Sequence, residues 1–351
     1  MLSKEELARY SKQIILPEIR EAGQEKLLTA KVLVIGAGGL GCPVLQYLAA
    51  AGVGLLGIAD GDVVEISNLQ RQILYNDSEI GQNKTHTTSK KIKALNPNIR
   101  VQTHPVNIDN TNALEILKDY DIIVDGSDNF ATRYLVNDAC VILNKPMVSG
   151  AIYKFEGQVS VFNYNNGPTY RCIFPEPPNT DESPNCADIG VIATLPGIIG
   201  TIQANEVIKV ITGIGEVLSG KLLVIDTLTM NTHLFHFKLN EANRNIKQLR
   251  SISPSCETII NIDYPGLKQL LKEDETIQLV DVREVEEHEI NNIGGMNIPV
   301  SVFESGCSIL NAEQPVILYC SSGVRSAHAA KILLQKGFIK VLNLKNGITG
   351  I

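Results

Sequence analysis

Residues 31–41, KVLVIGAGGLG, run from an apolar strand directly into a glycine-rich turn. Gly36, Gly38 and Gly41 match the dinucleotide-binding fingerprint, and Asp60 follows at roughly the 20-residue spacing expected of a ribose-binding acid. Glycine permits the tight turn and lets backbone N–H groups approach phosphate oxygens. By itself this stretch predicts a nucleotide site, and an NAD-dependent oxidoreductase is the first interpretation.

The composition is that of a globular protein with two domains. The chain has 351 residues, more than the roughly 100–200 residues of one typical domain. Hydrophobic residues make up 44% and charged residues 20%, which is ordinary for globular proteins. The net charge of −7 argues against a nucleic-acid partner, because phosphate binding needs clustered Lys and Arg.

The cysteines and the N-terminal stretch indicate a cytoplasmic protein. Seven cysteines, an odd number in a chain of this size, favour reduced thiols. MLSKEELARYSKQIIL offers Ser3 as a helix cap and lacks the apolar core of an export signal. The most apolar stretch, Ile189–Ile202, is shorter than the roughly 20 residues of a membrane span, so we expect a buried helix there and no membrane contact.

Strand-like and helix-like stretches alternate in the first 150 residues. Strands are expected at Val32–Ile35, Leu55–Ala59, Val101–Pro105 and Ile122–Val124, and helices at Pro43–Ala51, Lys84–Leu95 and Thr111–Lys118. This rhythm predicts an α/β fold with a Rossmann-like, doubly wound parallel sheet. Gly157–Tyr164 and Lys221–Ile225 alternate like antiparallel strands and predict a mixed extension of that sheet.

The segment DGDVVEISNLQRQ, Asp60–Gln72, is more specific than the glycine turn. Asn68, Arg71 and Gln72 supply phosphate-directed donors, and Lys84 adds a positive charge on the next helix. Asp128 follows the fourth strand, at the sheet edge where a carboxylate can hold magnesium against phosphate oxygens. ATP therefore replaces NAD as the expected nucleotide, with magnesium as its cofactor.

At this point the chain resembles the adenylyltransferases of molybdopterin and thiamine biosynthesis, which are relatives of the ubiquitin-activating enzymes. The resemblance covers roughly residues 5–240 and is carried by motifs in the family's order: RYSKQIIL, GAGGLG, DGDVVEISNLQRQ, GQNK, DGSDN, VSGA and EGQVSVF. It implies a ubiquitin-like sulfur-carrier protein as substrate. The carrier's C-terminal Gly-Gly carboxylate would attack the α-phosphate of ATP and form an adenylate.

The resemblance also assigns roles to individual residues. Gly38, Gly39 and Gly41 would approach the phosphates, and Asp60 would hold the ribose. Asn68, Arg71 and Lys84 would neutralise the triphosphate, and Asp128 would bind magnesium. The alternatives are solvated surface charges for Arg71 and Lys84, and a turn or helix cap for Asp128.

The N-terminal motif departs from the family pattern at Lys12. The family places a second arginine there, which reaches the γ-phosphate from the partner subunit of a homodimer. Lysine keeps the charge but loses the planar guanidinium fork. The resemblance therefore implies a homodimer in which Lys12 takes the arginine's place.

A second departure concerns zinc. Relatives carry two CxxC pairs, which suit a tetrahedral structural zinc site. In this chain the pairs have become Thr169 with Cys172 and Cys256 with Ile259. Two cysteines do not complete such a shell, so we expect no structural zinc.

Cys186, in SPNCADIG, matches a family cysteine that forms a thioester or disulfide with the carrier. The alternative is a small buried side chain, since free cysteine is among the most buried residue types. We expect Cys42, Cys140 and Cys307 to be packing residues.

The loop Cys320–Arg325, CSSGVR, places a thiol between a strand and a helix. The helix N-terminus, the loop N–H groups and Arg325 would all favour an anionic sulfur. Together with LVDVREVEEHEI and LNLKNGITGI, this loop resembles a rhodanese domain, a small α/β fold over about residues 258–351. Asp281 and Arg283 match that domain's first strand and are expected to be structural.

These observations predict an adenylyltransferase domain at 1–245, a linker at 246–257 and a rhodanese-like domain at 258–351. The carrier would be adenylated in the first domain and converted to a thiocarboxylate by a Cys320 persulfide, itself loaded by an upstream persulfide donor. The alternative is a degenerate domain that only docks the carrier beside an active rhodanese. Molybdopterin, thiamine and tRNA thiolation remain open as pathways.

Overall fold

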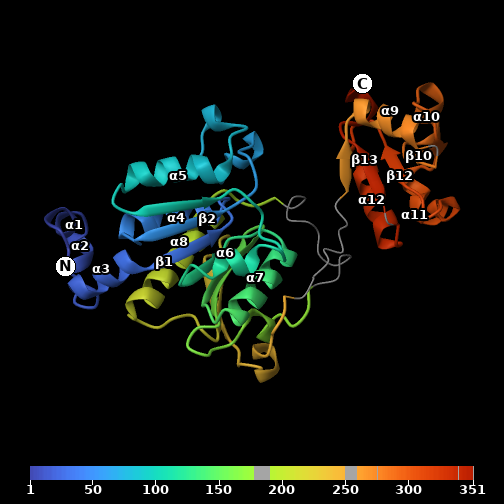
Figure 1. The fold of residues 1–351 in the computed structure, drawn as a ribbon. Coiled ribbons are helices and arrows are strands. Elements are labelled where there is room, and N and C mark those ends of the chain that lie inside the picture. Colours follow the sequence, from blue (N-terminus) through green and yellow to red (C-terminus); the bar gives the residue numbers. More distant parts are fainter. Residues whose placement is uncertain (178–189, 250–258, 275, 339, 351) are drawn as a thin grey trace. The chain divides into compact units, whose positions relative to one another are not determined.

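The computed structural model describes residues 1–177, 190–249, 259–274, 276–338 and 340–350. Its contacts divide the chain into two units, Met1–Ser251 and Ile252–Ile351, and each unit has a sheet of its own (Figure 1). The expected boundaries remain a prediction, because most of the expected linker lies outside the described residues.

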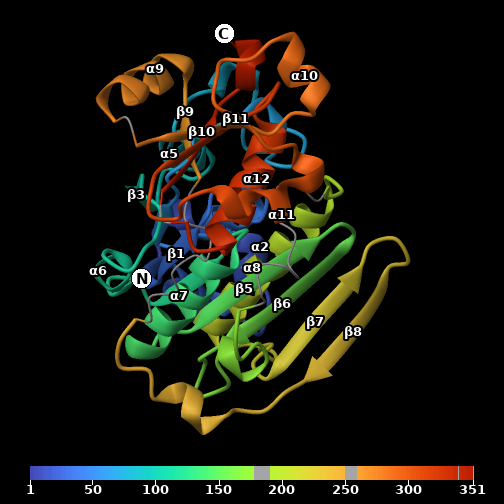
Figure 2. The same ribbon diagram turned by 90° about the vertical axis from the view of Figure 1, so that its right-hand side faces the viewer.

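The larger unit is built on a mixed sheet in the order β3-β2-β1-β4-β5-β6-β7-β8. Its strands are β1 (Lys31–Ile35), β2 (Leu55–Ala59), β3 (Arg100–His104), β4 (Ile122–Asp125), β5 (Met147–Tyr153), β6 (Glu156–Phe162), β7 (Lys221–Asp226) and β8 (Asn231–His236). Strands β1–β5 pair in parallel, and β5 to β8 pair antiparallel. Figure 2 shows β5–β8 side by side, with β8 at the edge. The predicted fold class, a doubly wound sheet with an antiparallel extension, is confirmed.

Helices cover both faces of the parallel strands. They are α1 (Lys4–Arg9), α2 (Ser11–Ile14), α3 (Arg20–Thr29), α4 (Gly41–Ala51), α5 (Lys84–Leu95), α6 (Ala113–Leu117), α7 (Phe130–Ile142) and α8 (Leu195–Thr212). Helix α4 packs against α5 and α8, while α6 packs against α7. Ser3 and Glu6 form a capping box at α1, as the sequence predicts.

The helix expected within Ile189–Ile202 begins partway through that stretch and continues beyond it. Helix α8 starts at Leu195, and Pro196 occupies its first turn, where a missing N–H costs nothing. Before it, Val191 forms a bridge with Lys154. Leu195, Ile199 and Val207 are buried against the sheet, so the expected burial is confirmed.

The strand order reverses between β1 and β4, which lie side by side although β2 and β3 intervene in the chain. Loops at the carboxyl ends of two such strands separate, and open α/β sheets bind ligands in the resulting crevice. The glycine turn follows β1 and the Asp125–Asp128 segment follows β4. The topology therefore places both motifs at one edge of the sheet.

The smaller unit has a parallel sheet in the order β11-β10-β12-β13-β9. Its elements are β9 (Ile260–Ile262), α9 (Tyr264–Glu273), β10 (Gln278–Asp281), α10 (Val285–Ile290), β11 (Met296–Asn297), α11 (Phe303–Gly306), β12 (Val316–Tyr319), α12 (Val324–Gln335) and β13 (Val341–Leu344). Apolar side chains of β10, β12 and α12 form its core. The Cys320 loop joins β12 to α12, as predicted.

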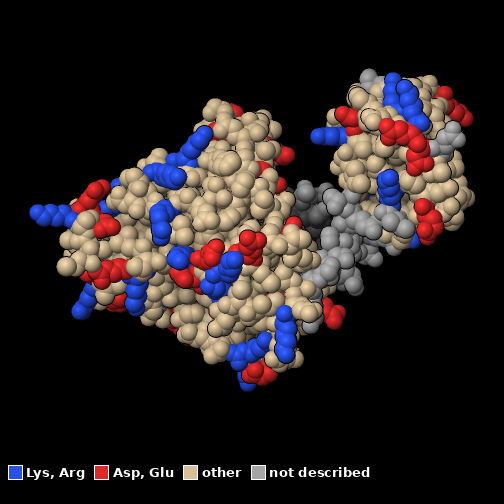
Figure 3. Space-filling view, viewed as in Figure 1, with Lys and Arg blue, Asp and Glu red and all other residues tan. Residues whose placement is uncertain are grey.

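Among the described residues, no helix is long and apolar enough to cross a membrane. Figure 3 shows Lys and Arg interspersed with Asp and Glu on the visible face of the larger unit.

Candidate active sites

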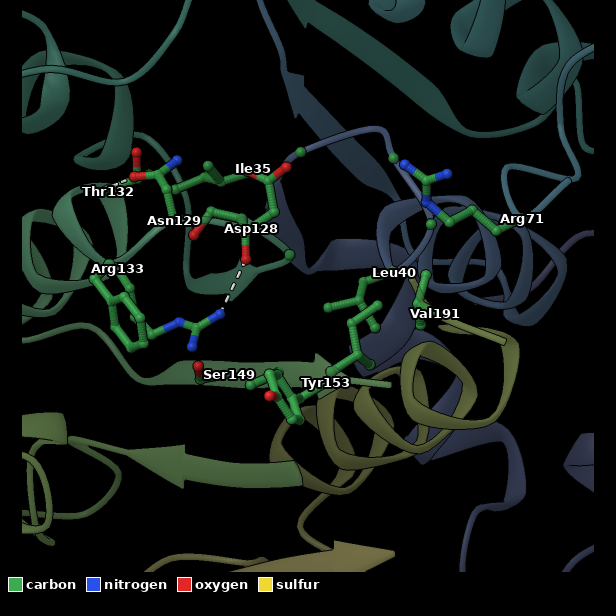
Figure 4. A pocket seen from close by; sticks show the side chains of 18 of the residues that line it. Ile35, Leu40, Arg71, Asp128, Asn129, Thr132, Arg133, Ser149, Tyr153 and Val191 are labelled. Carbon is green, nitrogen blue, oxygen red and sulfur yellow. Dashed lines mark hydrogen bonds between the residues drawn. The ribbon is translucent and has the colours of Figure 1, made fainter. Parts of the chain in front are cut away.

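A cavity of about 1130 Å³ opens at the carboxyl edge of β1, β2 and β4. Nine of the residues predicted to bind ATP or magnesium line it, namely Gly36, Gly38, Gly39, Asp60, Asn68, Arg71, Gln72, Lys84 and Asp128. Figure 4 shows Arg71 on one side of the cavity and Asp128 on the other, with Tyr153 and Val191 below. Tertiary structure thus brings together residues that lie as far apart in the chain as Gly36 and Asp128.

The glycines of the turn divide into two groups. Gly36 has a φ of +89°, and a Cβ on Gly41 would lie 1.9 Å from the Gly36 carbonyl oxygen, so these two glycines close the turn. Gly38 and Gly39 face the cavity, and a Cβ on Gly38 would meet nothing nearer than the Gln72 amide nitrogen at 3.5 Å. Gly41 does not line the cavity, so its predicted role in ATP binding reduces to shaping the turn.

Asp60 fastens the end of β2 to the glycine turn. Its carboxylate accepts hydrogen bonds from the backbone N–H groups of Ala37 at 2.7 Å and Asp62 at 2.8 Å. Burial raises the pKa of Asp60, and the nearby Lys84 ammonium partly offsets this effect. The carboxylate therefore lies at the cavity wall in a fixed orientation.

The segment after Asp60 turns its polar side chains toward the cavity. Asn68 and Gln72 are buried, and within the described part of the chain Asn68 Oδ1 and Gln72 Oε1 have no hydrogen-bond partner. Orphaned buried acceptors are costly, and a bound molecule with hydroxyl or amino groups would satisfy them. Arg71 donates to the Ser67 carbonyl at 3.0 Å and is half-buried.

Lys84, at the first position of α5, is almost fully buried and pairs with the exposed Asp62 at 3.0 Å. Asn83 caps the helix by accepting from the backbone N–H of Thr85 and His86. The ammonium therefore lies at the cavity floor, where an incoming phosphate would compete with Asp62 for it.

Asp128 is exposed toward the cavity and has no hydrogen-bond or ionic partner among the described residues. Asn129, rather than Asp128, caps α7 by accepting from the Thr132 N–H at 2.8 Å. The alternative of a helix cap for Asp128 is therefore wrong. A free carboxylate at this edge fits a magnesium ligand.

Beneath Asp128 lies a buried pair that the sequence did not predict. Arg133 Nε donates to Asp125 Oδ2 at 3.1 Å, and Asp125 also accepts from the hydroxyls of Ser127 and Ser149. Arg133 Nη2 donates to the Ser127 and Gly150 carbonyls. This network holds the loop that carries Asp128 against β5.

Lys12 does not line this cavity. It lies on the short helix α2 and is exposed. One chain by itself therefore does not bring Lys12 to the predicted nucleotide site.

Cys172 lies in a cage of hydrogen-bond donors. Its sulfur accepts from the backbone N–H groups of Thr169 at 3.4 Å and Asn240 at 3.3 Å, and from the Asn243 amide at 3.7 Å. Burial raises the pKa of this thiol, but the Thr169 hydroxyl and the other donors outweigh it, so the net pKa is lowered. Cys256, the expected remnant of the second pair, and Cys186 lie outside the described residues.

The thiol of Cys320 is buried beneath its loop. Its sulfur accepts hydrogen bonds from the Gly323 N–H at 3.1 Å, the Ser326 N–H at 3.5 Å and the Ser326 hydroxyl at 3.3 Å. Burial raises the pKa of Cys320, but the donors of Ser326, Ser322 and Gly323 outweigh it, so the net pKa is lowered. An anionic sulfur is therefore favoured at this position.

Arg325 is bound to a different partner from the one expected. Its guanidinium pairs with Glu287 of α10 through two bonds, at 2.6 Å and 2.7 Å. It is not among the hydrogen-bond donors to Cys320, which are neutral groups, and it interacts with that sulfur only through its charge.

Asp281 and Arg283 form a buried ion pair at 2.6 Å, to which His288 adds a bond, so their predicted structural role fits. Cys42, Cys140 and Cys307 are buried, as expected of packing residues.

Comparison with known proteins agrees with these two sites. The model of the ThiF family matches residues 10–248, and that of the rhodanese-like domain matches residues 265–351. The chain is 42% identical to the "Probable adenylyltransferase/sulfurtransferase MoeZ" of Mycobacterium tuberculosis, over 99% of this chain and 93% of that protein. The chain belongs to the ThiF family.

A second relative of this ThiF-family chain is the "Sulfur carrier protein adenylyltransferase" of Thermus thermophilus, 53% identical over 64% of this chain and 85% of that protein. Among solved structures, E. coli MccB with MccA-N7isoASN matches with a TM-score of 0.61 and 25% identity, over 68% of this chain and 73% of that one. The predicted resemblance is confirmed, and the chain is an enzyme of the adenylyltransferase and sulfurtransferase kind. Adenylyltransferases use ATP, so ATP rather than NAD is the nucleotide of this family, as expected.

Three functional candidates escaped the sequence analysis. Asp125 was passed over in favour of Asp128, although as the last residue of a buried strand it was the acid more strongly expected to point inward. Glu287 belongs to the quoted LVDVREVEEHEI stretch and Ser326 follows the Cys320–Arg325 loop, but their roles depend on contacts with Arg325 and Cys320.

Proposed function

We propose that this chain uses ATP to adenylate the C-terminal Gly-Gly carboxylate of a ubiquitin-like sulfur-carrier protein, and that a persulfide on Cys320 then supplies the sulfur of a thiocarboxylate. The observation that carries the proposal is one chain with two sites: a ThiF-family cavity lined by Asn68, Arg71 and Lys84, and a rhodanese-like loop with an activated thiol. The printed name of the Thermus relative supports the substrate class.

In the adenylation step the carrier carboxylate attacks the α-phosphorus of ATP, and pyrophosphate leaves. The N–H groups of the glycine turn approach the phosphates, Arg71 and Lys84 compensate their charge, and Asp60 accepts from the ribose. Asp128 would hold magnesium, which supplies charge compensation for the leaving pyrophosphate. Tyr153, Lys154 and Val191 also line the cavity, and we assign the carrier's tail to this part of it.

We further propose a homodimer in which Lys12 of each chain reaches the nucleotide of the other. Support comes from its exposed position on α2, outside its own chain's cavity. The arginine of the family pattern would make two directed bonds, whereas lysine supplies one point charge.

In the second step the terminal sulfur of the Cys320 persulfide attacks the adenylated carboxyl carbon, and AMP leaves. The product is an acyl disulfide between the carrier and Cys320. A second thiol must then attack the Cys320 sulfur to release the thiocarboxylate, and Cys186 is our candidate for that thiol. The resulting Cys186–Cys320 disulfide is then reduced by an external thiol, and an upstream persulfide donor reloads the free Cys320 thiolate.

Carrier-dependent exchange of pyrophosphate into ATP tests the adenylation. The protein is mixed with magnesium, ATP, labelled pyrophosphate and carriers that end in Gly-Gly, with a carrier truncated by its last glycine as control. We expect exchange only with intact carriers. A folded protein that binds ATP but exchanges with none of them would support a docking module in place of an adenylyltransferase.

A further inference from the structure

The carboxylate of Glu287 occupies both ends of the Arg325 guanidinium. Arg325 Nη1 donates to Glu287 Oε2 at 2.6 Å, and Nη2 donates to Oε1 at 2.7 Å. Nη2 also donates to the Ser321 hydroxyl at 3.0 Å, and that hydroxyl donates to Glu287 Oε1 at 3.2 Å. Bidentate pairs of this kind are the strong, directional form of an ion pair. The guanidinium N–H groups of Arg325 that could bind an oxyanion at the loop therefore already donate to Glu287.

Glu287 itself is held in place by its helix. Its Oε2 accepts from the Glu284 backbone N–H at 3.2 Å, which completes a capping box at α10. The Arg325 hydrogen bonds lower the pKa of Glu287 to about 2, so the carboxylate stays charged at neutral pH. The pair therefore contributes no net charge to the mouth of the Cys320 loop.

The sulfur of Cys320 depends on other groups. Its donors are the backbone of Gly323 and Ser326 and the Ser326 hydroxyl, all of them neutral. Val324, within the loop itself, is apolar and 72% exposed. A small dianion would meet neutral and apolar groups here, with Arg325 already engaged by Glu287.

We propose that Glu287 is a positioning residue which holds Arg325 away from incoming donors and so makes the Cys320 loop discriminate against small oxyanions. The inference rests on the proposed sulfurtransferase role of Cys320. Removing the Glu287 charge would free Arg325 to bind an anionic donor, and would strengthen the use of such donors while leaving the sulfur chemistry intact.

Thiosulfate is the probe. The Cys320 thiolate attacks its outer sulfur, the S–S bond of thiosulfate breaks, and sulfite leaves with the electron pair while the persulfide forms. Cyanide then takes the terminal sulfur as thiocyanate and regenerates the thiolate. The full chain is assayed as wild type, Glu287→Gln, Glu287→Asp and, as a matched loss of charge on the same helix, Glu286→Gln. Glutamine keeps an oxygen for the capping box, so α10 should remain folded.

For Glu287→Gln we expect the KM for thiosulfate to fall about fivefold with kcat within about twofold of wild type, because one charge-assisted contact becomes available to the donor. Glu287→Asp should restore most of the wild-type KM, and Glu286→Gln should not change it. A KM that is unchanged or higher in Glu287→Gln would overturn the inference.

Alkylation of the Cys320 peptide, followed by mass spectrometry, gives an independent readout. The ratio of its rates with anionic iodoacetate and neutral iodoacetamide should rise about fivefold in Glu287→Gln and stay constant in Glu286→Gln. A purely structural effect would alter both rates together and would contradict the proposal. If the wild type forms no persulfide at all, the proposed function fails, whereas an active wild type with an unchanged ratio in Glu287→Gln refutes only the positioning role.

Discussion

At the scale of single residues, the sulfur of Cys320 shows how neutral groups create a reactive thiol. N–H and O–H donors of Ser322, Gly323 and Ser326 converge on it, and they outweigh a burial that by itself would raise its pKa. Cys140, which is buried without such donors, has its pKa raised. The difference between a reactive and an inert cysteine in this chain lies in the hydrogen bonds to sulfur.

The Ser326 hydroxyl is a side-chain donor to the Cys320 sulfur, so one substitution can remove its hydrogen bond. Ser326→Ala should raise the Cys320 pKa, because a hydrogen bond to the charged form of the sulfur is lost. The thiolate is the reactive form, so the midpoint of the alkylation rate should move to higher pH. The measurement is the rate of Cys320 alkylation against pH, and Ser322→Ala, at an exposed position that contributes through its backbone, should keep the wild-type midpoint. Identical curves for both variants would remove Ser326 from the site.

Lys12 supports a second prediction at this scale. Lys12→Ala should reduce carrier-dependent pyrophosphate exchange about tenfold, because a positive charge at the γ-phosphate is lost. Lys4→Ala removes an equally exposed charge one helix earlier and should leave the rate near wild type. Equal exchange rates for the two variants would discard the proposed role of Lys12.

At the scale of elements, the turn between β1 and α4 separates the requirements of folding from those of binding. Gly41 faces the Gly36 carbonyl inside the turn, whereas Gly38 faces the cavity. Both belong to one fingerprint, yet Gly41 is required because a Cβ would overlap the backbone of the turn, whereas Gly38 has room for a Cβ and faces the cavity.

Substitution by alanine should distinguish the two glycines. Gly41→Ala should lower the free energy of unfolding by about 1–3 kcal/mol, because its Cβ would overlap backbone that cannot move aside. Gly38→Ala should change it by less than about 0.5 kcal/mol and weaken ATP binding instead. Chemical denaturation and ATP titration of both variants give the answer, and a Gly38→Ala protein with normal ATP affinity would exclude this turn from the phosphate site.

The hydrogen bonds to the Cys172 sulfur also connect separate elements of the fold. Hydrogen bonds from Thr169, Asn240 and Asn243 connect the segment after β6 to the one after β8. The resemblance places the first of its two zinc-binding pairs at Thr169 and Cys172.

We expect the chain to be stable without zinc. Treatment with a chelator should change Tm by less than about 2 °C, since a structural zinc would contribute far more to folding. Metal analysis of the purified protein is the direct measurement. One zinc per chain would show that the prediction is wrong.

At the scale of the whole molecule, two units with separate sheets and separate cores carry the two half-reactions. A short connection between two such sites raises the effective concentration of one reactant near the other. Because Cys320 belongs to the smaller unit and the ThiF-family cavity to the larger, the two activities should be separable by substitution.

Cys320→Ala in the full chain is the test of that separation. It should abolish formation of the carrier thiocarboxylate and leave pyrophosphate exchange within about twofold of wild type, because no adenylation residue is altered. Mass spectrometry of the carrier and the exchange assay measure the two outcomes. Loss of exchange as well would contradict the proposed division of labour.

The sequence by itself determined which local elements form and which motifs adjoin them. Apolar strands ending in Gly36 or Cys320, the Asn68–Gln72 block and the rhythm of strands and helices are encoded within short windows, where backbone geometry and side-chain periodicity act. For that reason the fold class and nine of the residues that line the cavity could be predicted. Asp128 was also predicted to lie at this edge, because it comes three residues after the end of β4.

Only the tertiary structure decided which charged groups meet. Arg325 pairs with Glu287 of a helix that precedes it by two strands, and Arg133, which lines the cavity, has its guanidinium paired with the buried Asp125. Such pairings depend on the relative positions of elements distant in the chain, and no local periodicity encodes them. The physical reason is that a charge's effect is set by its nearest partner and its burial, which exist only once the chain is folded.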